Sequence, residues 1–436
     1  MILGVRFVIL ILVAAVLIGL SGRWAPLQLV GISLIAATVT CALFDWLQLR
    51  RVMLEVTRTC DDKLSLGTEN LVRLSVRNSS YSGVRVAVRD EYPEEFAARG
   101  NVQSLRLLPR SEVDMVYYVT PSSRGDFTFG DVYMRVWGTL GLAIRQISFP
   151  MKRKVKVYPN LLEMRRYDIC QRHTYAVQPG RRVVRFRGKG TDFESLREYV
   201  PDDDFRTIDW KASARRGKLI TRQYQEEKSQ NVMIVLDCGR VMGPIIAGLT
   251  RLDHSINAGM MLAYIAAIKG DKVGLTAFAD DIIAYSPPRQ GKSQTLNLLR
   301  LTYNLANASG DSNYYRAIPY LSRKWTRRSL IVFFTDLISP ESSKPLISQI
   351  ATLAKKHLCL CVAMSDPAIA SSARGENLEK PEDAFIAAAA RQVLHDRQMA
   401  KAMLSRAGII VLDVPPERFT SSVVEKYLEI KAHAKL

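Results

Sequence analysis

The sequence predicts a multi-domain fold with three kinds of structure: two transmembrane helices, an all-β domain of the immunoglobulin-like sandwich type, and a doubly wound α/β domain. Two apolar segments open the chain, alternating apolar and polar residues follow, and apolar strands then alternate with helical patterns. The expected divisions are a transmembrane hairpin at 1–50, a β-sandwich at 51–160, a connector at 161–230 and the α/β domain at 231–436.

The composition favours an anionic partner. The 436 residues include 61 Lys and Arg against 42 Asp and Glu, which gives a formal net charge of +19. Such a charge attracts lipid surfaces, nucleic acids or acidic proteins. No run interleaves basic with aromatic residues as single-strand binders do, so nucleic acid is the least favoured partner. The six cysteines are scattered, and Cys359 and Cys361 have no second pair to complete a zinc site.

The first 50 residues have the pattern of a membrane hairpin. Residues 1–20 carry one charge, Arg6, residues 26–44 carry none, and both segments match the thickness of a bilayer core. A cleaved signal peptide is the alternative for the first segment, but a second apolar segment follows at once. Arginines follow the second segment, at Arg50, Arg51 and Arg58. The positive-inside bias therefore predicts a two-pass protein with the bulk of the chain in the cytoplasm.

A period of two from residue 51 to about residue 159 predicts the β-sandwich. Its clearest strands are expected at 71–78, 84–90, 113–120 and 127–136. Arginines alternate outward on two of these strands and indicate a solvated face, at Arg73, Arg77, Arg85 and Arg89. The domain has the pattern of a spacer or a binding module.

Residues 152–189 are the most basic part of the chain. Glycines interrupt the segment, which favours a flexible connector. Two interpretations stay open: a plain solvated loop, or contact with anionic lipid headgroups or an acidic protein near the membrane.

Carboxylates end two apolar strands of the α/β domain. Asp237 closes the run at 232–237, and Asp336 closes the run at 329–336. The carboxyl ends of parallel strands meet at one sheet edge, so we expect the two side chains to lie close together. Ser312, in the loop before a helix, adds a hydroxyl. Asp237, Ser312 and Asp336 form a candidate Mg²⁺ site, and the alternative is that these groups cap helices or bind loop amides.

The segment 190–230 is dense in charge and leads directly into the first α/β strand. The favoured interpretation is a structural segment tied by Arg–carboxylate pairs, and the alternative is an enzyme that uses the acidic cluster 192–209 as general acid/base groups or metal ligands. We predict no catalytic residue, because no oriented nucleophile is visible. The residues expected to carry interactions are Asp192, Arg197, Asp203, Asp204, Arg206, Asp209, Trp210 and Arg215.

This segment closely resembles the signature of the DUF58 family of bacterial proteins. The resemblance rests on GTDFESLREY (190–199), DDFRTIDWKASAR (203–215) and GKL (217–219). It implies two N-terminal transmembrane helices, a β domain, and an α/β domain similar to the von Willebrand factor A domain. It also implies a bacterial inner-membrane adaptor whose partner is a MoxR-type AAA+ ATPase.

Domains of the A type often carry a metal-ion-dependent adhesion site, with the pattern Asp-x-Ser-x-Ser after the first strand. Asp237 matches the pattern, but Gly239 and Val241 replace both serines. The loss of two oxygen ligands predicts weak Mg²⁺ binding at most, and no other cofactor is indicated. The degenerate site favours a fold kept for protein contacts.

Overall fold

The computed structural model describes residues 2–22, 26–160, 192–200, 203, 205–225, 229–375 and 381–432. The chain forms two compact units, Met1–Leu161 and Leu162–Leu436. The prediction of a multi-domain protein is confirmed. Of the basic segment 152–189, for which a solvated loop and an anionic contact both stay open, residues 161–189 lie outside the described residues.

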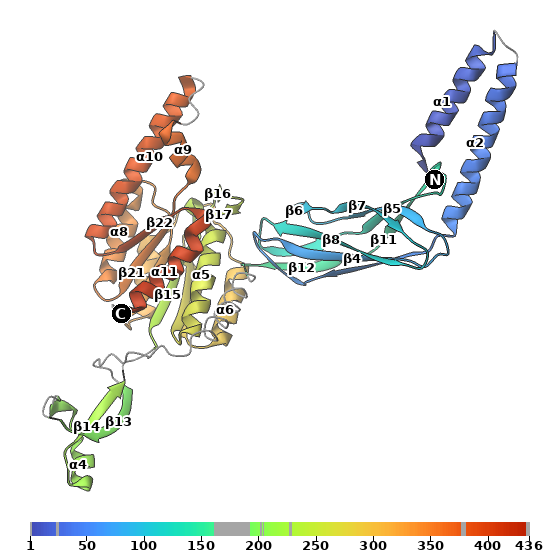
Figure 1. The fold of residues 1–436 in the computed structure, drawn as a ribbon. Helices are drawn as coiled ribbons and strands as arrows, with labels where there is room; N and C mark the ends of the chain where they lie inside the picture. The colour runs from blue at the N-terminus through green and yellow to red at the C-terminus, as the bar shows by residue number, and fades with distance from the viewer. Residues whose placement is uncertain are drawn as a thin grey trace. The chain divides into compact units, whose positions relative to one another are not determined.

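The first unit begins with two apolar helices, α1 (Val5–Gly19) and α2 (Pro26–Arg50), which lie side by side (Figure 1). Among the described residues, α2 is the one helix long and apolar enough to cross a membrane, with 25 residues, whereas α1 has 15. The sequence predicted two spans. The difference arises because Ile2–Leu3 form strand β1, which pairs with β11, and α1 starts only afterwards.

A carboxylate joins α2 to the β domain. Asp45, which is 1% exposed, accepts backbone N–H bonds from Leu140, Leu142 and Ala143 at 3.0–3.2 Å. Arg145 donates to the carbonyl of Leu49 at 2.9 Å, near the end of α2. The loop N–H groups thus bond to a side chain of α2, and a carbonyl at the end of α2 bonds to a side chain of β11. These bonds fix the end of α2 on β11.

The β domain consists of two main sheets. The five-stranded sheet has the order β1-β11-β10-β5-β7 and the four-stranded sheet the order β2-β4-β8-β6, and a smaller sheet has the order β3-β12-β9. The strands are β2 (Leu54–Cys60), β3 (Lys63–Ser65), β4 (Asn70–Asn78), β5 (Val84–Asp90), β6 (Phe96–Arg99), β7 (Val102–Leu107), β8 (Glu112–Pro121), β9 (Gly125–Phe129), β10 (Val132–Trp137), β11 (Ala143–Phe149) and β12 (Arg153–Tyr158). The segment expected as one strand at 127–136 is broken at Gly130, so β9 and β10 belong to different sheets. A side chain at Gly130 would meet the Glu91 carboxylate at 2.3 Å.

A buried ion pair connects the two main sheets. Arg58 of β2 donates to both carboxylate oxygens of Asp90 of β5, and Tyr117 of β8 donates to the same carboxylate at 2.5 Å. Burial raises the pKa of Asp90 more than the Arg58 guanidinium lowers it. Apolar side chains alternate inward along these strands and surround the pair.

The α/β domain of the second unit has a six-stranded sheet in the order β19-β18-β15-β20-β21-β22 (Figure 1). All neighbouring strands are parallel except β19, which pairs antiparallel with β18. The strands are β15 (Asn231–Asp237), β18 (Lys272–Phe278), β19 (Ile282–Arg289), β20 (Leu330–Phe334), β21 (Leu358–Met364) and β22 (Ile410–Val414), with a small hairpin of β16 (Ile245–Ile246) and β17 (Leu249–Thr250). The helices are α5 (Arg251–Ile268), α6 (Lys292–Tyr303), α7 (Tyr314–Lys324), α8 (Pro340–Ala354), α9 (Pro367–Arg374), α10 (Pro381–Arg406) and α11 (Pro416–Ala432).

Helices cover both faces of this sheet. Met233 and Val235 of β15 pack in one core with α7, α8 and α10. Ile234, between them, contacts α5, where Gly259 allows a close approach: a Cβ there would lie 3.3 Å from Ile234. Side chains of one strand thus alternate between two cores, which explains its unbroken apolar run.

Candidate functional site

The carboxyl edge of the six-stranded sheet holds Asp237, which is 0% exposed. One carboxylate oxygen accepts bonds from the Ser312 hydroxyl and, at 2.9 Å, from the Gly239 N–H. The other accepts from the hydroxyls of Tyr314 and Thr335, both at 2.7 Å. Burial and the Asp237 charge raise the pKa of Tyr314 well above its ordinary value, so the phenol stays a donor. Both oxygens of Asp237 are therefore occupied.

Asp336 lies between two arginines. Its carboxylate receives Arg251 from the first turn of α5 at 2.5 Å and Arg397 from α10 at 2.7 Å. The side chains of all three residues are at most 10% exposed. A buried carboxylate needs such partners, because desolvation of an unpaired charge costs several kcal/mol.

Arg397 extends this network to the next strand. It donates to both oxygens of Asp413 in β22 and to the carbonyls of Leu337 and Met364. Lys401 also reaches Asp413, at 3.1 Å. Burial opposes ionisation of Asp413, but Arg397 outweighs it and holds the pKa of that carboxyl below its ordinary value.

The three residues of the expected Mg²⁺ site are Asp237, Ser312 and Asp336. The structure brings Asp237 and Ser312 together, as the sequence suggested, but it pairs Asp336 with guanidinium groups. A magnesium ion needs open oxygen ligands in octahedral geometry. The donor set does not fit the ion, because hydroxyl and amide donors fill Asp237 and two cations already neutralise Asp336. Among the described residues, no group of three or more His, Cys, Asp or Glu could hold a metal.

Gly239 lies in close contact with Ser312. A Cβ placed on Gly239 would lie 2.0 Å from the Ser312 Oγ. The Ser312 hydroxyl thus fills the space that a side chain at position 239 would need. Glycine at 239 and the inward-pointing serine at 312 depend on each other.

The edge also exposes two apolar side chains. Ile245 of the β16–β17 hairpin is 72% exposed, and Ile338, after β20, is 47% exposed. The Arg251–Asp336 ion pair fixes both segments, since Ile245 precedes Arg251 by one short hairpin and Ile338 follows Asp336 by two residues. Exposed ion pairs lie in nearby loops, Arg240–Asp311 and Arg316–Asp281, both at 3.0 Å. The edge therefore combines exposed apolar side chains with charged loops.

The signature segment forms a small module of β13 (Asp192–Glu198), α4 (Trp210–Arg216) and β14 (Ile220–Gln225), with β13 and β14 antiparallel. Arg197 pairs with Asp203 at 2.5 Å. Asp209 caps α4 by accepting N–H bonds from Lys211 and Ala212. These two predicted acids thus have partners inside the module.

Two further predicted signature residues are exposed on α4. Trp210 is 68% exposed, and Arg215 lies exposed in the last turn of α4. Asp204 lies outside the described residues, as do the side chains of Asp192 and Arg206.

Sequence reasoning missed Arg251, Arg397 and Asp413. Asp413 could have been found from the sequence, because it too lies near the end of an apolar strand, 410–414. No local sequence pattern marks the two arginines, since each lies on a helix and pairs with Asp336 only in the folded protein. The thiols of Cys359 and Cys361 are not candidates for metal binding or nucleophilic attack, because burial raises the pKa of each to about 12.

Fold and site together define a class: a multi-domain chain with an N-terminal apolar helix and β domain, and a C-terminal α/β domain whose sheet edge is charge-paired. A family model described as "Protein of unknown function DUF58" matches residues 195–386, from within β13 into α10. The resemblance seen in the sequence is confirmed over that range.

Curated relatives match the chain in part. Uncharacterized protein YeaD of Bacillus subtilis (strain 168) is 28% identical over 128 residues, which cover 29% of this chain and 32% of that protein. Uncharacterized protein Rv1480 of Mycobacterium tuberculosis (strain ATCC 25618 / H37Rv) is 25% identical over 183 residues, which cover 41% of this chain and 56% of that protein. The match thus spans between a third and just over half of these relatives.

Two solved structures illustrate the structural matches. Native alpha-2-macroglobulin from Escherichia coli, from domain MG7 to the C-terminus, has a TM-score of 0.22 and 12% identity, and the match covers 25% of this chain and 17% of that chain. The CARDB domain of the PF1109 protein from Pyrococcus furiosus has a TM-score of 0.17 and 16% identity, with 24% and 93% covered. Similarities at this level carry no conclusion about function.

Proposed function

We propose that the protein is a membrane-anchored adaptor that holds a protein partner at the carboxyl edge of its α/β sheet. The observation that carries the proposal is the pairing of Asp336 with Arg251 and Arg397. The ion pairs of this network hold the loops of the edge in place. Ile245 and Ile338 in these loops remain exposed. Rigid loops with exposed apolar anchors and a charged rim are the pattern of a protein interface.

The α/β domain is similar to the von Willebrand factor A domain in this proposal. The parallel sheet with helices on both faces and the buried Asp237 and Asp336 at the ends of adjacent strands support it. The partner implied by the resemblance is a MoxR-type AAA+ ATPase. In place of a metal-bridged contact, binding would use the apolar and charged groups of the edge.

The anchor in this proposal is a two-pass hairpin of α1 and α2 in the bacterial inner membrane, with both units in the cytoplasm. The mean hydropathy of α2, 2.1 over its most apolar 18-residue window, supports insertion. Close packing at Ala14 and Gly31 supports a paired hairpin, because a Cβ on Gly31 would lie 3.1 Å from the Ala14 carbonyl oxygen. The signature module, which belongs to the second unit, would be a structural segment tied by Arg–carboxylate pairs such as Arg197–Asp203.

An affinity capture tests this function. The full chain is solubilised in detergent from its native cells and captured with and without ATP, as wild type, as Ile245→Asp/Ile338→Asp, and as Leu296→Asp. Leu296 on α6 is the matched control, because its side chain is 58% exposed. The start of α6 lies at the opposite edge of the sheet, since Gln294 donates to the carbonyl of Val273 near the start of β18.

We expect a MoxR-type ATPase with wild type and the control in a nucleotide-dependent manner, and at least about tenfold less with the double variant, the effect of losing about 1.4 kcal/mol of binding energy. Recovery of no ATPase above a control bait would refute the proposal. Equal recovery by the double variant would move the contact away from this edge.

A further inference from the structure

The outer face of the five-stranded sheet in the β domain carries four exposed arginines. We define this basic face by Arg85, Arg89, Arg106 and Arg135. Strand register places Arg85 directly opposite Arg106 on the neighbouring strand, although like charges in such positions repel. No acidic partner within ion-pair distance is found for the four among the described residues.

The outer face of the four-stranded sheet provides the contrast. It also carries exposed arginines, and two of them, Arg73 and Arg77, have acidic neighbours. Arg77 lies in register with Glu55 on one side and Glu112 on the other, and Arg73 lies 3.7 Å from Asp114. One face of the domain is thus balanced in charge, while the other keeps a cluster of positive charge.

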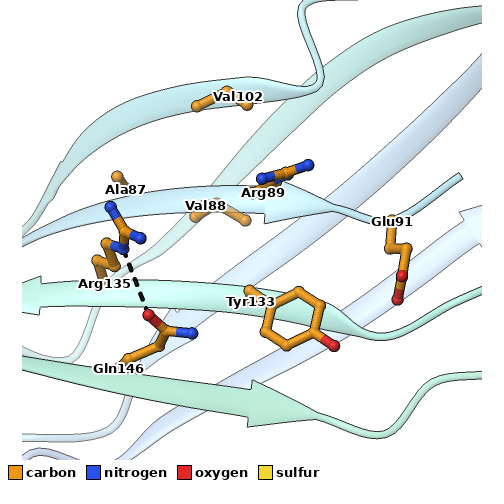
Figure 2. A pocket seen from close by; sticks show the side chains of 8 residues that line it. All are labelled: Ala87, Val88, Arg89, Glu91, Val102, Tyr133, Arg135 and Gln146. Carbon is orange, nitrogen blue, oxygen red and sulfur yellow. Dashed lines mark hydrogen bonds between the residues drawn. The ribbon is translucent and has the colours of Figure 1, made fainter.

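The basic face is also hollowed. A cavity of about 480 Å³ lies on this face. Figure 2 shows the side chains that line it, among them Ala87, Val102, Arg89, Arg135 and Tyr133. Arg135 is oriented by a 3.4 Å contact to Gln146. Glu91, the acidic residue at the end of the cavity, already accepts the Asp131 N–H at 3.2 Å. A small floor with guanidinium groups beside it suits a phosphate group with attached apolar atoms.

The basic face belongs to the same sheet that holds the membrane helix. β11 contributes Gln146 to the cavity, and the neighbouring Arg145 binds the end of α2. Neighbouring strands lie about 4.8 Å apart, so the face extends to about 15 Å from β11. In Figure 1, the hairpin extends from one end of the β domain. Trp137, stacked under Arg85 at 5.6 Å, is of a type enriched at membrane surfaces.

We propose that the basic face binds the phosphate of anionic lipid headgroups in the membrane that the hairpin enters. The proposal rests on the membrane anchor of the proposed function and adds a lipid-binding site that holds the β domain against the bilayer. Each arginine near an anionic surface contributes about 1 kcal/mol, roughly a fivefold gain in affinity. The affinity for a headgroup held by both Arg89 and Arg135 would therefore rise roughly 25-fold.

Native mass spectrometry of the full chain in detergent tests the proposal by titration with phosphatidylglycerol, phosphatidylcholine, inorganic phosphate and polyglutamate. The variant is Arg89→Gln/Arg135→Gln, and the matched control is Arg73→Gln/Arg77→Gln on the other sheet. We expect phosphatidylglycerol to bind roughly 25-fold more tightly than phosphatidylcholine, the preference to disappear in the variant, and the control to keep it. Melting temperature in detergent verifies that both variants are folded.

Three outcomes would overturn the proposal. Equal phosphatidylglycerol binding by the variant would assign the lipid to the helices instead. Inorganic phosphate that binds as tightly as the lipid would indicate a soluble anion, and preferential binding of polyglutamate would indicate an acidic protein. Each of these results leaves the adaptor function intact, because that function is judged separately by ATPase capture.

Discussion

The carboxyl edge of the α/β sheet and the basic face of the β domain use charge in opposite ways. At the edge, Asp336 is buried between Arg251 and Arg397, and Asp413 pairs with Arg397 as well. On the basic face, Arg85 and Arg106 lie side by side in solvent. The difference teaches that density of charged residues does not reveal function. Charges that pair with one another inside the fold stabilise a structure, whereas neighbouring like charges on a surface repel and favour an anionic partner.

The largest effect is expected at the closed edge. Arg397→Leu leaves Asp336 and Asp413 short of a buried cation, and breaking a buried pair costs about 3–5 kcal/mol. At about 2–4 °C per kcal/mol for a domain of this size, the α/β domain should melt at least about 6 °C lower in differential scanning calorimetry of the detergent-solubilised chain. Arg406→Leu, on the exposed face near the end of α10, is the control. A shift no larger than the control's would show that the network is not structural.

A smaller loss of stability is expected when a side chain is added at Gly239, because the space beside it is filled. Gly239→Ser places a Cβ 2.0 Å from the Ser312 Oγ and should cost about 1–3 kcal/mol through overpacking. Adding Ser312→Ala removes the clash and should recover part of the loss, since the new hydroxyl lies near Asp237. Gly310→Ser, with open space around its Cβ, should be neutral. Thermal unfolding of the wild type, Gly239→Ser, Ser312→Ala, the double variant and the Gly310→Ser control tests this, and strict additivity of the two substitutions would contradict it.

The smallest effect, of opposite sign, is expected on the basic face. Arg106→Gln removes the like charge opposite Arg85 and should raise the free energy of unfolding by about 0.2–0.5 kcal/mol at low salt. Arg73→Gln, which removes an attraction to Asp114, should not stabilise. Because surface charges are screened, the gain should fall as salt rises. Denaturant titration at two ionic strengths is the measurement, and a loss of stability with Arg106→Gln would mean that the face already has a partner within the chain.

The sequence by itself determined the elements and their order. Apolar runs without polar interruption predict buried parallel strands, so β15 and β20 and their terminal aspartates were visible before folding. Period-two alternation likewise predicted the β domain, because an exposed sheet face needs polar residues at every second position. The apolar segment of α2 was equally plain. All three are local patterns, and local patterns follow from the spacing of side chains along a helix or strand.

Only the tertiary structure decided what those residues contact. Asp336 meets Arg397 across 61 positions of sequence, and Arg58 meets Asp90 between two sheets. The length of α1 was set by the pairing of β1 with a strand more than a hundred residues away. The four arginines of the basic face come from three strands, and strand register alone made them neighbours. The position of a charged residue in the sequence does not identify its partner. The partner depends on which elements become neighbours, and this is decided only when the core packs.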